Sequence, residues 1–208
     1  MFQDRKDAGE RLAENLEKFR DKDVLVLAIP RGGVEVGYQV ATYLRADFSL
    51  LISRKLPYPD NPEAGFGAVA EDGSAVILKH AARWLSDEEV NRIVLVQGKE
   101  VERRCRVLRG GKPLPLIAGK TVILVDDGLA MGSTMSAAVL LCRKKHAAKV
   151  VVAVPVSGSR VAKEIDGLAD ETIILEIPSS FQAVAQVYRN WYDVSDGEVR
   201  KIMRKWKR

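Results

Sequence analysis

The sequence is poor in the residues that build disulfide frameworks and zinc sites. Its 208 residues include two cysteines and two histidines. Cys105 and Cys142 fall in separate helix-like patterns with no pairing spacing, so we expect two buried or inert thiols. His80 and His146 are isolated as well, and we expect both at surface or boundary positions. A metal centre of cysteine and histidine is therefore not indicated.

Long apolar runs are missing too. No stretch approaches the length of a membrane span, and the chain is charged from Asp4 onward, unlike a secretion signal. We therefore expect a cytoplasmic protein without a membrane partner. The composition, 47% hydrophobic and 29% charged, is that of an ordinary globular protein. We predict one domain over residues 1–208, with its core at about 22–178 and with terminal helices and a small hood from 1–21 and 179–208.

Apolar runs alternate with helical patterns along the chain. Strands are predicted at 24–29, 48–53, 121–125, 149–155 and 172–177. Helices are predicted at 5–20, 34–45, 86–109, 134–145 and 159–168, and from about 195 onward. Nearly continuous apolar strands separated by helices favour the α/β class, with a Rossmann-like central parallel sheet flanked by helices.

The stretch between the second predicted strand and the long helix breaks this alternation. Three prolines and two glycines fall between Pro57 and Gly67, which predicts a long flexible loop. Residues 67–78 carry an Asp-Gly pair at Asp72 and Gly73, which predicts a β-hairpin. Because long loops in compact domains are often functional, the first segment is a candidate lid over a site.

Residues 121–135 carry the strongest functional signal. A buried strand ends in Asp126 and Asp127, and Gly132, Ser133 and Thr134 then open a helix. The unpaired N–H groups at a helix start can hold a phosphate. Paired carboxylates can accept hydrogen bonds from a diol or hold a hydrated divalent cation. Together they indicate a sugar phosphate, whereas an acid pair alone is more often a merely solvated strand end.

A second segment follows the first predicted strand. Pro30-Arg31-Gly32-Gly33 lets the backbone approach an anion, and Arg31 can add a charge-assisted contact. The alternative is a tight turn with an exposed arginine. The glycine spacing is not that of a dinucleotide-binding fold, and the chain has no Gly-Lys-Ser/Thr loop, so dehydrogenase and nucleotide-hydrolase functions are disfavoured. A third segment, Arg54-Lys55, follows the next predicted strand, and strand ends of a parallel sheet converge on one crevice.

Residues 121–135 resemble the ribose-phosphate-binding motif of type I phosphoribosyltransferases, and in particular of a subgroup without an assigned acceptor. Residues 30–33 look like the pyrophosphate-binding loop of that family, and Arg54-Lys55 resembles the basic pair that opens the flexible loop of its orotate-type members. The resemblance implies transfer of the phosphoribosyl group of phosphoribosyl pyrophosphate (PRPP) to a nitrogenous base or amine, with release of pyrophosphate. The implied PRPP-binding residues are Pro30, Arg31, Gly32, Gly33, Arg54, Lys55, Asp126, Asp127, Gly128, Leu129, Ala130, Met131, Gly132, Ser133 and Thr134.

The same resemblance implies a role for each part. Asp126 and Asp127 face the ribose hydroxyls and hold Mg²⁺ through water, and residues 130–134 wrap the 5-phosphate. Residues 30–33 bind pyrophosphate, and Lys55 reaches it from a loop that closes over the site. The implied catalytic residues are Asp126, Asp127, Lys55 and Arg31. No side chain is an obvious general base.

Two positions depart from the family pattern. Met131 stands where a threonine usually precedes the second glycine, and Ala130 stands where purine-salvage members usually carry an aspartate. The second departure disfavours a standard hypoxanthine or guanine enzyme. In the hood, Phe181 is a candidate to stack on the acceptor ring, or else a core aromatic.

Other functions stay open from sequence alone. The segment 103–115, rich in arginine, lysine and glycine, is an alternative lid, and a homodimer is possible. With a net charge of +5, the basic face of the last helix could serve a regulator that senses PRPP or binds nucleic acid, although a solvated helix is the simpler interpretation. A phosphate-accepting receiver domain is third, because receivers carry their acidic residues early in the chain.

Overall fold

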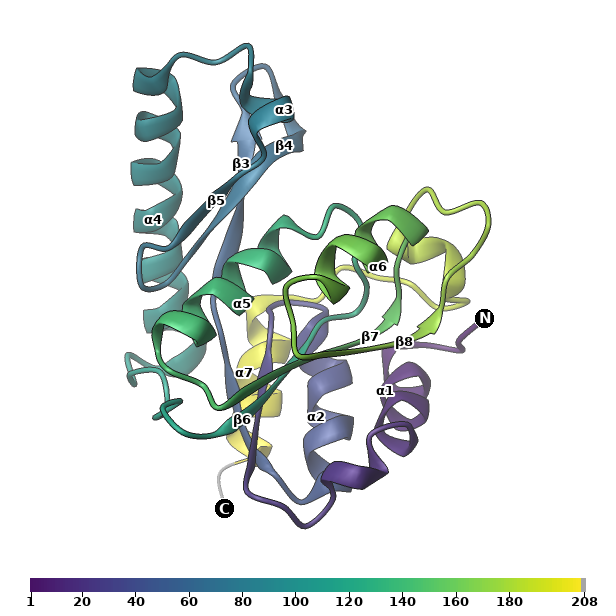
Figure 1. The fold of residues 1–208 in the computed structure, drawn as a ribbon. Coiled ribbons are helices and arrows are strands. Elements are labelled where there is room, and N and C mark those ends of the chain that lie inside the picture. The colour runs from purple at the N-terminus through teal and green to yellow at the C-terminus, as the bar shows by residue number, and fades with distance from the viewer. Residues whose placement is uncertain (207–208) are drawn as a thin grey trace.

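A computed structural model describes residues 1–206 of the chain, which form a parallel sheet between two layers of helices (Figure 1). The parallel strands are β1 (Val24–Ala28), β2 (Asp47–Leu50), β6 (Thr121–Val125), β7 (Lys149–Val156) and β8 (Glu171–Glu176), in the order β2-β1-β6-β7-β8. A second, antiparallel sheet contains β3 (Ser53–Tyr58), β4 (Asn61–Ala70) and β5 (Ala75–Ile77). The predicted α/β class with a central parallel sheet is confirmed.

The described helices lie on both faces of the parallel sheet and beside the second sheet. They are α1 (Arg5–Glu14), α2 (Gly33–Leu44), α3 (Lys79–Ala82), α4 (Asp87–Arg109), α5 (Ser133–Lys144), α6 (Ser159–Asp166) and α7 (Asp196–Trp206), with short 3-10 turns at Glu17–Phe19 and Val184–Val187. The predicted helix over 5–20 is therefore wrong in length, because α1 ends at Glu14. Within the described residues, the structure has no helix both long and apolar enough to cross a bilayer.

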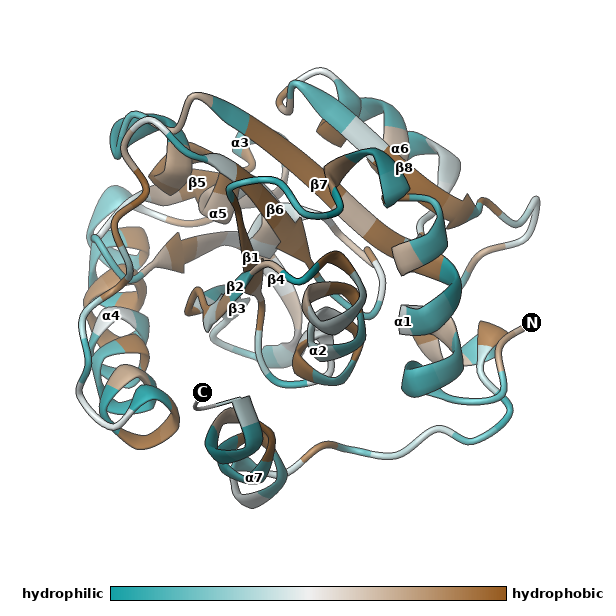
Figure 2. Ribbon diagram, turned by 90° about the horizontal axis from the view of Figure 1, so that it is seen from below, coloured by the Kyte–Doolittle hydropathy of each residue, from teal (hydrophilic) through white to brown (hydrophobic). Residues whose placement is uncertain are grey.

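Alternating side chains of each strand pack against opposite helix layers. In β1, Val24 and Val26 join the cluster that contains α1 and α2, whereas Leu25 and Leu27 join the cluster that contains α5 and α6. The other inner strands follow the same alternation, so both faces of the sheet are apolar and covered (Figure 2). This burial fixes the register of the strands, and their carboxyl ends form one edge.

The predicted long loop between Pro57 and Gly67 is wrong. The structure continues β3 to Tyr58 and begins β4 at Asn61, so a tight β-hairpin replaces the loop. The register of this pair shifts on either side of Pro57, which is how an antiparallel ladder accommodates a residue without an N–H. The predicted hairpin over 67–78 is confirmed as β4 and β5. The alternative lid at 103–115 begins inside α4, which ends at Arg109.

The second sheet, α3 and α4 form an arm beside the parallel sheet, at the upper left of Figure 1. A buried ion pair fastens the arm. Arg109 of α4 donates to Glu71 Oε1 at 2.8 Å and to the Leu50 carbonyl at 2.9 Å. Glu71 also accepts from the Ile52 N–H at 3.0 Å, and the Arg109 and Glu71 side chains are 5% and 9% exposed. The end of β2, the β4–β5 turn and the end of α4 are thus joined at one point.

The cysteines match the expectation of inert thiols. Cys142 is buried in α5, and Cys105 lies half-buried in α4. Burial raises the pKa of Cys105 to about 11 and that of Cys142 to about 12. Both thiols are therefore protonated and unreactive at neutral pH.

Candidate functional site

Asp126 and Asp127 lie at the carboxyl end of β6, the central strand of the parallel sheet. The Asp127 N–H donates to Asp126 Oδ1 at 2.9 Å, which turns the first carboxylate back over the chain. Burial raises the pKa of Asp126 well above its usual value, and the neighbouring Asp127 charge raises it further. Burial also raises the pKa of Asp127, against the opposing effect of Arg5. Two such acids are desolvated oxygen acceptors, suited to a diol or a hydrated cation.

The Pro-Arg-Gly-Gly segment packs directly on this acid pair. A Cβ on Gly32 would lie 1.8 Å from Asp127 Oδ2, and a Cβ on Gly33 would lie 2.8 Å from Asp126 Cα. Glycine is therefore required at both positions for the loop to approach the acids. The Pro30–Arg31 peptide bond is cis, and α2 begins at Gly33. The structure thus brings together two of the three segments identified from sequence.

Residues 128–132 form a tight turn between β6 and α5, and Ser133 and Thr134 are the first residues of the helix. The Leu129 N–H donates to the Val156 carbonyl of β7 at 2.9 Å, and Gly132 adopts a left-handed φ of 74°. The first helical hydrogen bond of α5 runs from the Ser136 N–H to the Gly132 carbonyl at 2.8 Å. The N–H groups of Ser133 and Thr134 precede that bond and have no helical acceptor, which is the geometry of a phosphate cradle. Ala130 and Met131 are exposed at its rim.

The third segment is placed differently from the sequence prediction. Arg54 and Lys55 lie inside β3 of the antiparallel sheet, because the parallel strand β2 already ends at Leu50. Arg54 donates to Gln97 of α4 at 2.8 Å, and its guanidinium lies 3.7 Å from Glu100. Lys55 pairs with Ala68 of β4. The prediction that this pair directly follows a parallel strand and opens a flexible loop is therefore wrong.

Arg31 extends from its loop toward the last helix. Its side chain is 40% exposed and lies 3.7 Å from Asp196 Oδ1, at the start of α7. Arg103 of α4 lies 4.0 Å from the other oxygen of the same carboxylate. Arg31 therefore faces an anion already in this structure, and α7 and α4 both reach the edge of the site.

Sequence reasoning missed Arg5. This residue is 4% exposed, and its Nε donates to Asp127 Oδ2 at 2.8 Å across 122 positions of the chain. Within the sequence it looks like an ordinary basic residue of an amphipathic helix, so no local signal identifies it. Tyr188, which is also buried, donates from its hydroxyl to the Asp127 carbonyl at 2.7 Å.

Phe181 lies beyond β8, beside the start of α6. A Cβ on Gly158 would lie 3.1 Å from the Phe181 ring, and the ring packs half-buried against a small cluster containing Phe2, Val187 and Tyr188. Trp191 and Tyr192 both lie against the Arg5 guanidinium. The hood residues are thus packed around the edge of the site.

The donor set fits Mg²⁺ shared with a ligand. Among residues 1–206, the structure gathers no group of three or more histidine, cysteine, aspartate or glutamate side chains around a common point. Two adjacent carboxylates match an ion that keeps several waters and takes further oxygens from a phosphate. Asp126 and Asp127 are the residues that could hold it.

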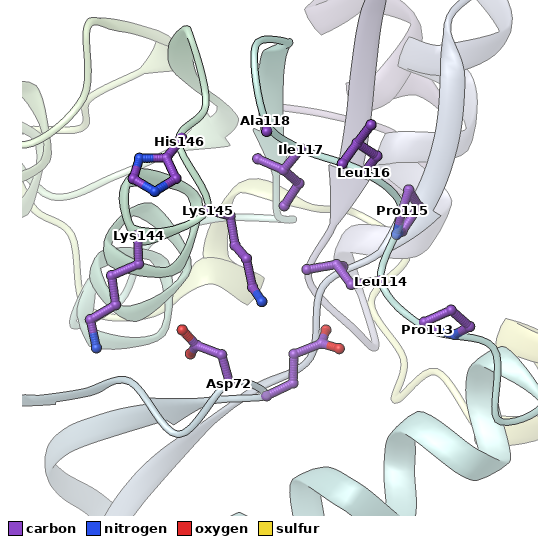
Figure 3. A pocket seen from close by; sticks show the side chains of 11 residues that line it. Asp72, Pro113, Leu114, Pro115, Leu116, Ile117, Ala118, Lys144, Lys145 and His146 are labelled. Atoms are coloured by element: carbon purple, nitrogen blue, oxygen red, sulfur yellow. The ribbon is translucent and has the colours of Figure 1, made fainter.

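Two cavities lie away from these segments. One of about 480 Å³ is lined by the 113–118 segment, the carboxyl end of α5 and the β4–β5 turn (Figure 3). It lies near the amino ends of β6 and β7, opposite the acid pair. Another, of about 410 Å³, lies between α4, β2 and α7. Neither is lined by Asp126, Asp127 or the residue 30–33 loop.

The sheet is open and parallel, and its carboxyl edge carries an acid pair, a glycine loop and a turn that starts a helix. These features define the class of α/β proteins that bind ligands at that edge. A family model described as "Phosphoribosyl transferase domain" matches residues 2–190. The chain therefore belongs to the phosphoribosyl transferase domain family, and the resemblance noted from sequence is confirmed.

Similar proteins agree with this assignment. Two Mycobacterium tuberculosis proteins, from strains CDC 1551 and H37Rv and each named "Putative phosphoribosyl transferase", are 40% identical over 201 residues. That match covers 96% of this chain but 45% of either relative, so the chain spans about half their length. The crystal structure of TT1426 from Thermus thermophilus superposes with a TM-score of 0.83 at 35% identity, covering 99% of this chain and 98% of that one.

Proposed function

We propose that this chain transfers the phosphoribosyl group of PRPP to a nitrogenous acceptor, with release of pyrophosphate and with Mg²⁺ as the metal. The observation that carries the proposal is the packing of Gly32 and Gly33 on Asp127 and Asp126, beside the turn that opens α5. A pyrophosphate-type loop, two diol acceptors and a phosphate cradle then share one edge of the sheet.

Catalysis in such a site is mainly electrostatic. Loss of pyrophosphate from C1 leaves a cationic sugar, so the enzyme must neutralise the leaving group and hold the ribose. Arg31 and the N–H groups of its loop serve the first task. Asp126 and Asp127 hold the ribose hydroxyls, and residues 130–134 hold the 5-phosphate. Asp126 and Asp127 would hold Mg²⁺ through water, and the bound ion would supply positive charge at the pyrophosphate.

Arg54 and Lys55 take a changed role in this proposal. Since both lie in strand β3, any contact that they make with the pyrophosphate would come from the arm rather than from a closing loop. Arg54 is bound to Gln97 and Glu100, and Arg31 lies 3.7 Å from Asp196, so each arginine must exchange a protein partner for the pyrophosphate.

The acceptor is a base or an amine that enters beside the hood. Exposed Ala130 and Met131 provide no acidic side chain at the rim of the turn. A purine held through an acidic residue at that position is therefore disfavoured. Phe181 packs on Gly158, which follows the carboxyl end of β7, and it is our candidate for stacking on a planar acceptor.

The test is calorimetric binding of PRPP with Mg²⁺ to the wild type and to Asp126→Asn/Asp127→Asn. We expect binding by the wild type and none by the double variant, because both diol acceptors become neutral. Asp166→Asn, at an exposed position at the end of α6, is the matched control and should bind as the wild type does. A wild type that fails to bind PRPP would overturn the proposal.

A second candidate is a PRPP-sensing regulator that binds nucleic acid. The basic residues Arg200, Lys201, Arg204 and Lys205 of α7 are exposed, while Val199 on the opposite side is buried. Electrostatic binding of this kind weakens steeply with salt. If the wild type binds a duplex oligonucleotide at moderate salt and the Lys201→Glu/Lys205→Glu variant does not, the regulator is favoured over the enzyme.

A further inference from the structure

Arg5 is a buried guanidinium beneath the candidate site. Besides its hydrogen bond to Asp127, its Nη1 donates to the Tyr192 carbonyl at 2.8 Å. Its guanidinium carbon lies 4.0 Å from the centre of the Trp191 ring. A charge removed from water is stable only when it is paired and hydrogen-bonded, and Arg5 has both kinds of partner. Its conformation is therefore fixed by three contacts from two distant parts of the chain.

Arg5 also touches the loop that packs on the acids. A Cβ on Gly32 would lie 2.9 Å from Arg5 Nε, and Glu35 of α2 lies 3.8 Å from Nη1. One side chain thus joins the start of α1, the end of β6, the start of α2 and the hood segment 188–192. Asp127 is the member of this group that faces the candidate ligand.

We propose that Arg5 is a positioning residue of the phosphoribosyl site: it binds one oxygen of Asp127 and orients the other toward a ribose hydroxyl. The inference rests on the proposed function. Arg5 acts through Asp127 and does not touch the sugar. Arg5 therefore contributes to the affinity for ligands that carry the ribose diol. Inorganic pyrophosphate has no diol, so its affinity does not depend on Arg5.

The test uses two probes, ribose 5-phosphate and inorganic pyrophosphate, each titrated calorimetrically into the full chain without Mg²⁺, so that no metal on Asp127 links pyrophosphate binding to Arg5. In Arg5→Met we expect ribose 5-phosphate affinity to fall about tenfold or more, as for loss of one charge-assisted contact. Pyrophosphate affinity should stay at the wild-type value. Arg5→Lys keeps the charge but cannot make both hydrogen bonds, to Asp127 and to the Tyr192 carbonyl, so its ribose 5-phosphate affinity should lie between those of the wild type and Arg5→Met.

Lys6→Met is the matched control, because Lys6 is on the same helix and its side chain is 68% exposed. It should bind both probes as the wild type does. Equal losses of both probes in Arg5→Met, the result expected if Arg5 only supports the fold, would overturn the inference. So would wild-type binding of ribose 5-phosphate by Arg5→Met.

A double-variant cycle keeps the inference testable if Arg5→Met does not fold. Combined with Asp127→Asn, the Arg5→Lys change should cost no further ribose 5-phosphate affinity, because the group that it orients is already altered. Additive losses would overturn the role through Asp127. A wild type that binds neither ribose 5-phosphate nor PRPP would overturn both the proposed function and this inference, whereas wild-type binding with additive losses would overturn the inference alone.

Discussion

At the scale of single residues, the site depends on close approach between backbone and carboxylate. Gly32 has φ −60° and ψ −37°, values that any residue can adopt, so its backbone does not require glycine. The space around it does, because Asp127 and Arg5 occupy the volume where a Cβ would lie. The requirement therefore comes from a contact between residues far apart in the chain.

Gly32→Ala should consequently damage the site with little local backbone strain. The added methyl group must displace Asp127 or the loop, at a cost of about 1–3 kcal/mol typical of overpacking. We expect PRPP affinity to fall about tenfold or more for a cost of that size, measured by calorimetry. Gly98→Ala is the control, since a Cβ there meets nothing within 4 Å, and unchanged PRPP affinity in Gly32→Ala would contradict the argument.

At the scale of elements, the arm is held to the parallel sheet by Glu71 and Arg109. The β4–β5 turn supplies the carboxylate and the last turn of α4 supplies the guanidinium, and both also bind backbone groups near the end of β2. A capping box at Ser86 and Glu89 starts α4, and a left-handed Gly110 ends it, which agrees with the helix predicted at 86–109. Residues within and next to α4 therefore determine where the helix begins and ends, whereas its attachment to the parallel sheet depends on residues distant in the chain.

Arg109→Met should lower the free energy of unfolding by about 3–5 kcal/mol, because it leaves Glu71 buried without its partner. Urea unfolding monitored by circular dichroism measures the change. Arg106→Met, at an exposed position on the same helix, should have little effect. Glu71→Leu/Arg109→Met removes both charges and should recover part of the loss, and no recovery would argue against an ion-pair effect.

At the scale of the whole molecule, three elements meet beside the site through charged side chains. Glu100 of α4 contacts Arg103 and Arg104 of its own helix and Arg54 of β3, and Arg103 reaches Asp196 of α7. The hydrogen bond from Arg103 is the largest cause lowering the pKa of Glu100, which falls to about 2. This network connects the arm with the carboxyl-terminal helix.

The lowered pKa predicts how stability depends on pH. A carboxyl group with a folded pKa of about 2 and an ordinary value of 4.5 contributes stability that is fully present above pH 4.5. That contribution is lost as the pH falls from 4.5 toward 2. Glu100→Gln should therefore unfold at lower urea than the wild type at pH 7, and the difference should shrink toward pH 3. Glu102→Gln, at an exposed neighbouring position, should show no such trend.

Local patterns were sufficient for much of the fold and for part of the site. Apolar runs of strand length indicated the parallel sheet, since burial on both faces requires them in the sequence itself. The acids at 126–127 and the turn at 128–132 follow their strand directly, so their place at the carboxyl edge could be predicted. Their roles toward PRPP remain predictions.

The features that local patterns did not predict depend on tertiary structure. The prolines at 57–62 suggested a loop, but pairing with β4 makes the segment a hairpin, and the ladder accommodates Pro57 at an irregularity. Arg54 and Lys55 were placed at a strand end until the second sheet showed them within β3. Arg5 has no distinguishing neighbours in sequence, and its role depends on a contact 122 positions away. Periodicity reports which face of an element is buried, whereas only the packed chain determines which distant side chains meet.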